Sequence, residues 1–226
     1  MPGLFFVGVA VLIVIILVFN IIQGQKRRKE LMAWAASNGF SFSPEKDAGM
    51  DERFPGFACL RKGSRRYACN CMRGRYHERR CTGFDYHYET YSTDSKGHRQ
   101  THHHNFSAMI IDSGYRLKPL SIRSEGLFDK LTEFIGFDDI DFESAEFSRE
   151  FYVKAPDKRW AYDVIQQSTM ELLLASPRFS LELQDRYCIA YRSSRFSVQD
   201  FQAALEVIEG IITRLPFSLV KEITGE

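Results

Sequence analysis

Five of the six histidines of this 226-residue chain fall between residues 87 and 104. His102 and His104 are two positions apart, so an extended strand places both on one face. His87 lies in the preceding segment of strand character, and pairing of the two strands would bring three imidazoles together. Three nitrogen ligands with an open position suit Zn²⁺ acting as a Lewis acid or activating water. The pattern therefore predicts a metal site at His87, His102 and His104.

A second interpretation of the same histidines needs no function. They border a polar loop at residues 92–100, and an exposed strand end of this kind binds Zn²⁺ or Ni²⁺ adventitiously. The sequence has no HExxH, no GxxxxGK[ST], no GxGxxG after a strand and no GxSxG. We therefore expect a non-enzymatic binding or interaction module without a cofactor, and keep a metal-dependent hydrolase that uses the histidine cluster as the alternative.

Cysteine usage indicates reduced thiols. The chain has five cysteines without a framework spacing, which argues against a disulfide-stapled domain. Cys69 and Cys71 share one face of a predicted strand, but a redox or metal site would need a second pair or a lowered thiol pKa. We interpret these two as small core residues.

The charge is balanced overall but unevenly distributed. The chain has 30 basic and 29 acidic residues, which excludes a generally basic nucleic-acid-binding surface. Residues 53–80 hold nine Lys or Arg and one acid, and residues 124–150 hold nine acids and two bases. The basic block would suit anionic lipid headgroups, or the two blocks face each other within the fold. No RNA-binding aromatic signature or helix-turn-helix pattern is present, so we do not expect a nucleic-acid partner.

The N-terminal segment is the most apolar part of the chain. Sixteen of the 19 residues at positions 4–22 are Leu, Ile, Val or Phe, and as a helix they extend roughly 28 Å. No charged side chain precedes the segment, which argues against a cleaved signal peptide. Four basic residues follow it: Lys26, Arg27, Arg28 and Lys29. The pattern predicts a single-pass signal-anchor.

The basic residues also predict an orientation. The positive-inside rule leaves the N-terminus outside and the following domain in the cytoplasm. The bilayer is then a partner, and the four basic residues would also contact anionic headgroups. An unidentified protein partner is expected for the domain itself.

The remaining elements indicate an α+β fold. A transmembrane anchor at 1–25 and a basic juxtamembrane helix at 26–39 precede a β-rich half at 40–137, read as an antiparallel meander with a tight turn near His77 and Glu78. A strand-helix-hairpin-helix half follows at 138–217, with a tail at 218–226. Spacing alone leaves open whether the two halves share one core.

Several motifs resemble a known group of sequences. They are the uncharged N-terminus, the apolar segment, the four basic residues, the strand motif at 84–88 (FDYHY) and the segment at 139–144 followed by Phe147. Together they resemble an uncharacterised family of bacterial single-span membrane proteins, and residues 140–216 resemble a wider bacterial domain of unknown function. The resemblance implies a domain anchored in a bacterial inner membrane and assigns no catalytic residue.

Overall fold

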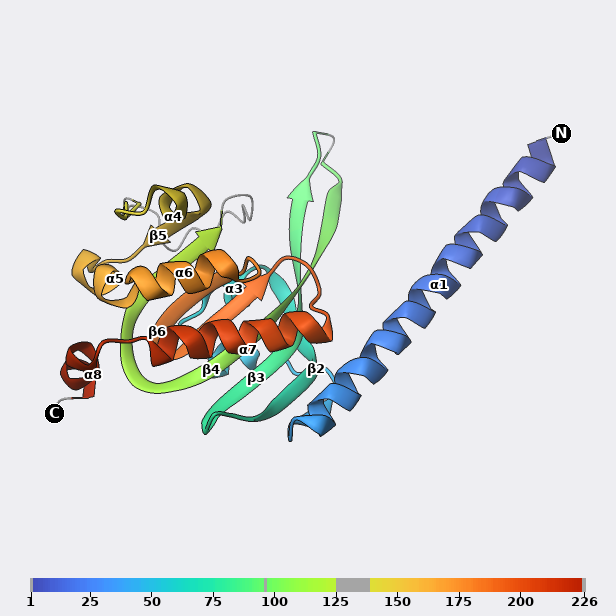
Figure 1. Cartoon of the computed structure of the whole chain (residues 1–226). Coiled ribbons are helices and arrows are strands. Elements are labelled where there is room, and N and C mark those ends of the chain that lie inside the picture. Colours follow the sequence, from blue (N-terminus) through green and yellow to red (C-terminus); the bar gives the residue numbers. More distant parts are fainter. Residues whose placement is uncertain (1, 96, 125–138, 225–226) are drawn as a thin grey trace.

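The computed structural model describes residues 2–95, 97–124 and 139–224. Its centre is an antiparallel sheet in the order β1-β2-β3-β4-β5, with β6 also paired to β4 (Figure 1). The strands are β1 (Ser41–Ser43), β2 (Ser64–Tyr76), β3 (Arg79–Thr93), β4 (Arg99–Ser124), β5 (Phe151–Lys154) and β6 (Ser180–Arg192). Helices cover both faces, so the protein is α+β.

A two-residue turn joins β2 to β3. His77 and Glu78 form it with φ values of 44° and 67°, in the left-handed region that a tight hairpin turn demands at both positions. Glycine and asparagine meet this demand most readily, so two other residue types here carry some backbone strain. The turn lies at the place that the sequence indicates.

Strand β4 joins the two halves of the chain. Its first part pairs with β3, from Arg99 to Ile111, and its later part pairs with β6, from Ser107 to Ile122. The end of β4 also pairs with β5. The register of the β4–β6 pairing shifts between Asp112 and Leu117, where Gly114 has a φ of 79°. Strands from 40–137 and from 138–217 therefore belong to one sheet.

The larger apolar cluster lies between the sheet and the C-terminal helices. Helix α7 (Val198–Thr213) begins with a capping box in which Ser197 and Asp200 bond each other's backbone N–H. Its buried face includes Phe201 and Ile208, packed with β-strand residues such as Met109. Four more helices complete this side: α4 (Ala145–Glu150), α5 (Lys158–Val164), α6 (Gln167–Ala175) and α8 (Phe217–Thr224).

A smaller apolar cluster covers the opposite face of the sheet. It contains residues of two short helices, α2 (Met50–Arg53) and α3 (Ala58–Arg61), packed on Phe84, Tyr86 and Ile110. The Tyr86 hydroxyl donates to the Leu60 carbonyl at 2.6 Å. All five cysteines are free thiols. Burial raises the pKa of Cys71 to about 11 and that of Cys81 to about 12.

Helix α1 (Pro2–Ser37) continues without a break across the expected boundary at residue 25. Within the described part of the chain, no helix combines the length and the apolarity needed to cross a membrane. The prediction of a transmembrane helix is therefore wrong.

Two further predictions depended on that helix. One was a single-pass signal-anchor, and the other was an inner-membrane location with the N-terminus outside and the domain in the cytoplasm. Neither is supported, because both require a spanning helix that the described residues do not provide. Figure 1 shows α1 leaving the domain as a long projecting helix. We call residues 2–25 of this helix the arm.

Candidate interaction site

The base of α1 is fixed to the sheet by a two-pronged ion pair. Arg27 Nη1 lies 2.7 Å from Asp85 Oδ2, and Arg27 Nη2 lies 2.8 Å from Asp85 Oδ1. Asp85 is in β3 and is only 3% exposed. A planar guanidinium matched to both carboxylate oxygens gives a strong and directional contact.

Each oxygen of Asp85 has a second donor. The Asn70 side-chain amide donates to Oδ2 at 2.8 Å, and the Ser107 hydroxyl donates to Oδ1 at 2.5 Å. The Ser107 hydroxyl in turn accepts from the Phe196 backbone N–H, and Arg27 Nε donates to the Phe196 carbonyl at 2.8 Å. The network thus joins α1, β2, β3, β4 and the segment before α7, and leaves the carboxylate fully paired.

Apolar packing continues the attachment towards the end of α1. Leu31 and Ala35, four and eight positions after Arg27, are fully buried, as expected for one helix face. Trp34 stacks on Phe40 and Phe201, with ring centroids 5.4 and 6.4 Å apart. The C-terminal third of α1 is therefore part of the domain.

The arm has the opposite character. Its described large apolar side chains are exposed, between 40% for Val9 and 68% for Phe6. Of the four basic residues predicted to flank a membrane, Arg27 turns into the domain, whereas Lys26, Arg28 and Lys29 are exposed. Lys26 lies 4.0 Å from Glu30 on the same helix.

The predicted metal ligands do not come together. In the β3–β4 register His104 is opposite Tyr88 and His102 is opposite Thr90. The His104 ring stacks on Tyr88 at 4.6 Å between ring centroids, and its Nε2 lies 2.8 Å from the Thr90 hydroxyl. Nε2 of His102 lies 2.7 Å from the Ser92 hydroxyl.

His87 is on the other face of this hairpin. Its cross-strand partner is Asn105, so it shares a face with Glu89 and with His103, the partner of Glu89. Side chains along a strand alternate between its two faces, so His103 lies on the opposite face from His102 and His104. The hairpin register, with Thr93 opposite Arg99, is the feature that decides which histidines meet.

Several cations of the basic block pair with described acids that lie outside the acidic block. Arg66 lies 2.9 Å from Asp51, and Arg73 lies 2.7 Å from Asp47. Arg79 pairs with Glu209 of α7 at 3.2 Å. In the acidic block, positions 125–138 lie outside the described residues.

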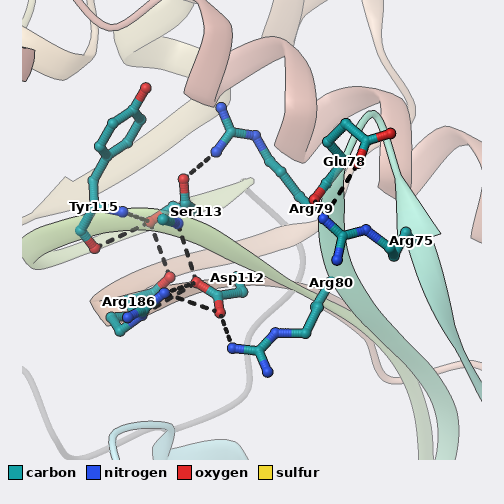
Figure 2. Close-up of polar contacts among 9 residues, drawn as sticks. Arg75, Glu78, Arg79, Arg80, Asp112, Ser113, Tyr115 and Arg186 are labelled. Carbon is teal, nitrogen blue, oxygen red and sulfur yellow. Dashed lines mark hydrogen bonds and ion pairs between the residues drawn. The ribbon is translucent and has the colours of Figure 1, made fainter.

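Asp112 is a second buried carboxylate that is paired with arginine, and Figure 2 shows its contacts. Arg80 and Arg186 contact its carboxylate at 3.1 and 3.2 Å, and the Gly114 backbone N–H donates to Oδ1 at 3.0 Å. Burial alone would raise the pKa of Asp112, but these hydrogen bonds outweigh it and hold the pKa below its usual value. Asp112 and Arg80 also line a solvent-open depression of about 190 Å³.

Sequence reasoning missed the network around Asp85. Asp85 stands in the aromatic motif at 84–88, where a carboxylate between large apolar residues is a signal for a buried ion pair. Its partners Asn70 and Ser107 are uncharged and carry no signal of their own. Arg27 was assigned to the membrane because three other cations adjoin it.

Comparison with known proteins gives one informative likeness of fold. No protein-family model matches the chain, and no curated protein matches it. The crystal structure of the mycobacterial trehalose monomycolate transport factor A, TtfA, superposes with a TM-score of 0.61 at 9% sequence identity. The match covers 83% of this chain and 94% of that one. At this identity the likeness concerns the fold alone.

Proposed function

We propose that this protein is a non-enzymatic interaction module that acts at a lipid surface. The observation that supports the proposal most directly is the attachment of α1. Arg27 and Asp85 fix the base of the helix to the sheet, while the arm beyond it exposes apolar side chains. An apolar arm attached to the domain in this way would hold the domain against an apolar surface such as lipid.

The distribution of exposed residues favours lipid as the occupant. Four consecutive positions, residues 13–16, are exposed to between 50% and 58%, so the apolar surface surrounds the helix. A partner helix would cover only one stripe of this surface, so we favour lipid as the occupant. The exposed cations Lys26, Arg28 and Lys29 follow directly and would contact anionic headgroups.

The rest of the domain supports a role without catalysis. Burial raises the pKa of the thiols of Cys71 and Cys81, which makes them poor nucleophiles. The three histidines that a hydrolase was predicted to use face opposite sides of a hairpin. The structural neighbour is named as a transport factor, a title that fits an interaction role.

Flotation with vesicles tests the proposal. The full chain is reconstituted with phosphatidylcholine vesicles, with or without phosphatidylglycerol, and the bound fraction is measured. We expect Ile13→Glu with Leu17→Glu to lower binding at least about tenfold, because charge enters lipid at high cost. Met32→Glu with Phe217→Glu is the matched control, since these apolar residues are also exposed but lie outside the arm.

Two outcomes would overturn the proposal. One is a full chain that remains unbound with both vesicle types, and the other is an equal loss in the arm variant and in its control. Circular dichroism of each variant checks that the domain is folded. Changing Lys26, Arg28 and Lys29 to Ser should reduce only the additional binding that phosphatidylglycerol provides, by roughly fivefold per residue.

A further inference from the structure

We propose that His87, Glu89 and His103 form a binding site for a transition-metal ion of the zinc class. The site is at the base of the β3–β4 hairpin and does not depend on the proposed function. Ligand atoms of the three residues all lie within 4.8 Å of one another. Glu89 Oε1 is the common point, 3.8 Å from His87 Nε2 and 3.5 Å from His103 Nδ1.

These separations are close to those of a metal centre. Zn–N and Zn–O bonds of about 2.0–2.1 Å in a tetrahedron place neighbouring ligand atoms about 3.4 Å apart. Small rotations of side chains therefore suffice to close the site. The two imidazole rings stack, with centroids 5.6 Å apart and planes 30° from parallel, and each ring has one nitrogen near Glu89 Oε1.

The partner of His87 Nδ1 leaves Nε2 available to a metal ion. His87 Nδ1 lies 3.2 Å from Asn105 Oδ1, an acceptor, and the tautomer that donates from Nδ1 satisfies this contact. In that tautomer, Nε2 directs a lone pair towards the carboxylate oxygen of Glu89. Two acceptors that face each other are held together by a metal ion or by a proton between them. Asn105 has the position of the outer partner that orients a metal-bound imidazole.

Glu89 is held so that one oxygen stays available. The side chain is 8% exposed, and its Oε2 accepts from the Tyr91 hydroxyl at 3.0 Å. Arg65 Nη1 also approaches Oε2, at 3.7 Å. Both contacts are to Oε2, which leaves Oε1 facing the two histidines.

The ligand set indicates the class of ion. Two imidazoles and one carboxylate suit Zn²⁺, Co²⁺ or Ni²⁺ better than Mg²⁺ or Ca²⁺, which prefer oxygen ligands. Three protein ligands leave one coordination position for water or for a group from another molecule. His103 is 60% exposed, so the site is accessible from solvent.

Zinc retention by the full chain tests the site, and neighbouring histidines provide matched controls. The protein is prepared without a metal-binding tag, equilibrated with Zn²⁺, dialysed and analysed for metal per chain. We expect near one equivalent, lost in His103→Ala and in Glu89→Gln. We expect His102→Ala and His104→Ala to retain it, because their side chains lie on the opposite face of the hairpin.

Several results would overturn the site. Equal losses in His102→Ala, His103→Ala and His104→Ala would show adventitious binding by the histidine tract. No retained zinc in the parent chain would mean that a proton, not a metal, lies between Glu89 and the histidines. Asn105→Ala should weaken zinc binding about 10- to 100-fold without abolishing it, since it removes only the orienting contact. Circular dichroism confirms the fold of each variant.

Discussion

Asp85 and Asp112 are both buried carboxylates of the same sheet, and both are paired with arginine. They differ in the segments of the chain that they connect. Asp85 receives one arginine and two neutral donors, and its network includes five separate segments of the chain. Asp112 receives two largely exposed arginines, from the adjoining strand β3 and from the segment of β6 next to it.

The difference shows how position determines what an ion pair does. The side chains of Arg80 and Arg186 are 73% and 58% exposed, so water can replace much of their interaction with the Asp112 carboxylate. The side chains of Arg27 and Asp85 are 21% and 5% exposed, so water has little access to replace the contact between them. The enclosed pair, Arg27 and Asp85, joins segments that are distant in the sequence. The exposed cluster, Asp112 with Arg80 and Arg186, strengthens strands that already pair.

The largest expected effect is at the enclosed pair. Asp85→Asn leaves Arg27 partly buried without a counter-charge, which should lower the free energy of unfolding by about 3 kcal/mol. Arg27→Ala should cost a similar amount, and the double variant should cost less than the sum of the two. Urea unfolding of the full chain measures all three.

The neighbouring residue Lys26 is the control for this prediction. Its exposed contact with Glu30 predicts a change of less than about 0.5 kcal/mol for Lys26→Ala. Equal losses in Lys26→Ala and Arg27→Ala would show that the pairing of Arg27 with Asp85 has no special energetic role.

A smaller effect is expected at the exposed cluster. Asp112→Asn removes the charge that Arg80 and Arg186 share but keeps the shape of the side chain. We expect the free energy of unfolding to fall by about 1 kcal/mol, because both arginines regain water. A loss as large as that of Asp85→Asn would contradict the distinction between the two sites.

The smallest expected effect is a pH dependence. The pKa of Asp112 is lowered in the folded chain, so the unfolded chain binds more protons as the pH falls through 4. The stability that this group contributes is therefore present above its unfolded pKa and is lost as the pH falls through its folded pKa. Between pH 5.5 and 3, the parent should lose more stability than Asp112→Asn, by less than about 1 kcal/mol. Equal losses would contradict the assignment.

The sequence was sufficient to identify many local elements of this fold. The turn at His77 and Glu78 follows from neighbouring residues. The pairing of Arg27 with Asp85 does not, because 58 positions separate them and nothing local selects one arginine among four basic residues. Contacts of this kind depend on the complete arrangement of the sheet.

The site residues show the same limit in another form. The histidine tract draws attention to the β3–β4 hairpin, but a change of one position in register exchanges the faces. The sequence therefore selected His102 and His104, where the structure places His103 beside His87 and Glu89. The apolar composition of the arm likewise could not establish a spanning helix.

The position of α7 late in the chain has a consequence for synthesis. Phe201, Leu205 and Ile208 cover the sheet, yet the ribosome adds them after all the described strands. Until then β3 and β4 present an uncovered apolar face, although most of their strand partners already exist. A nascent chain halted before residue 198 should therefore associate with chaperones, and synthesis of α7 should end that dependence.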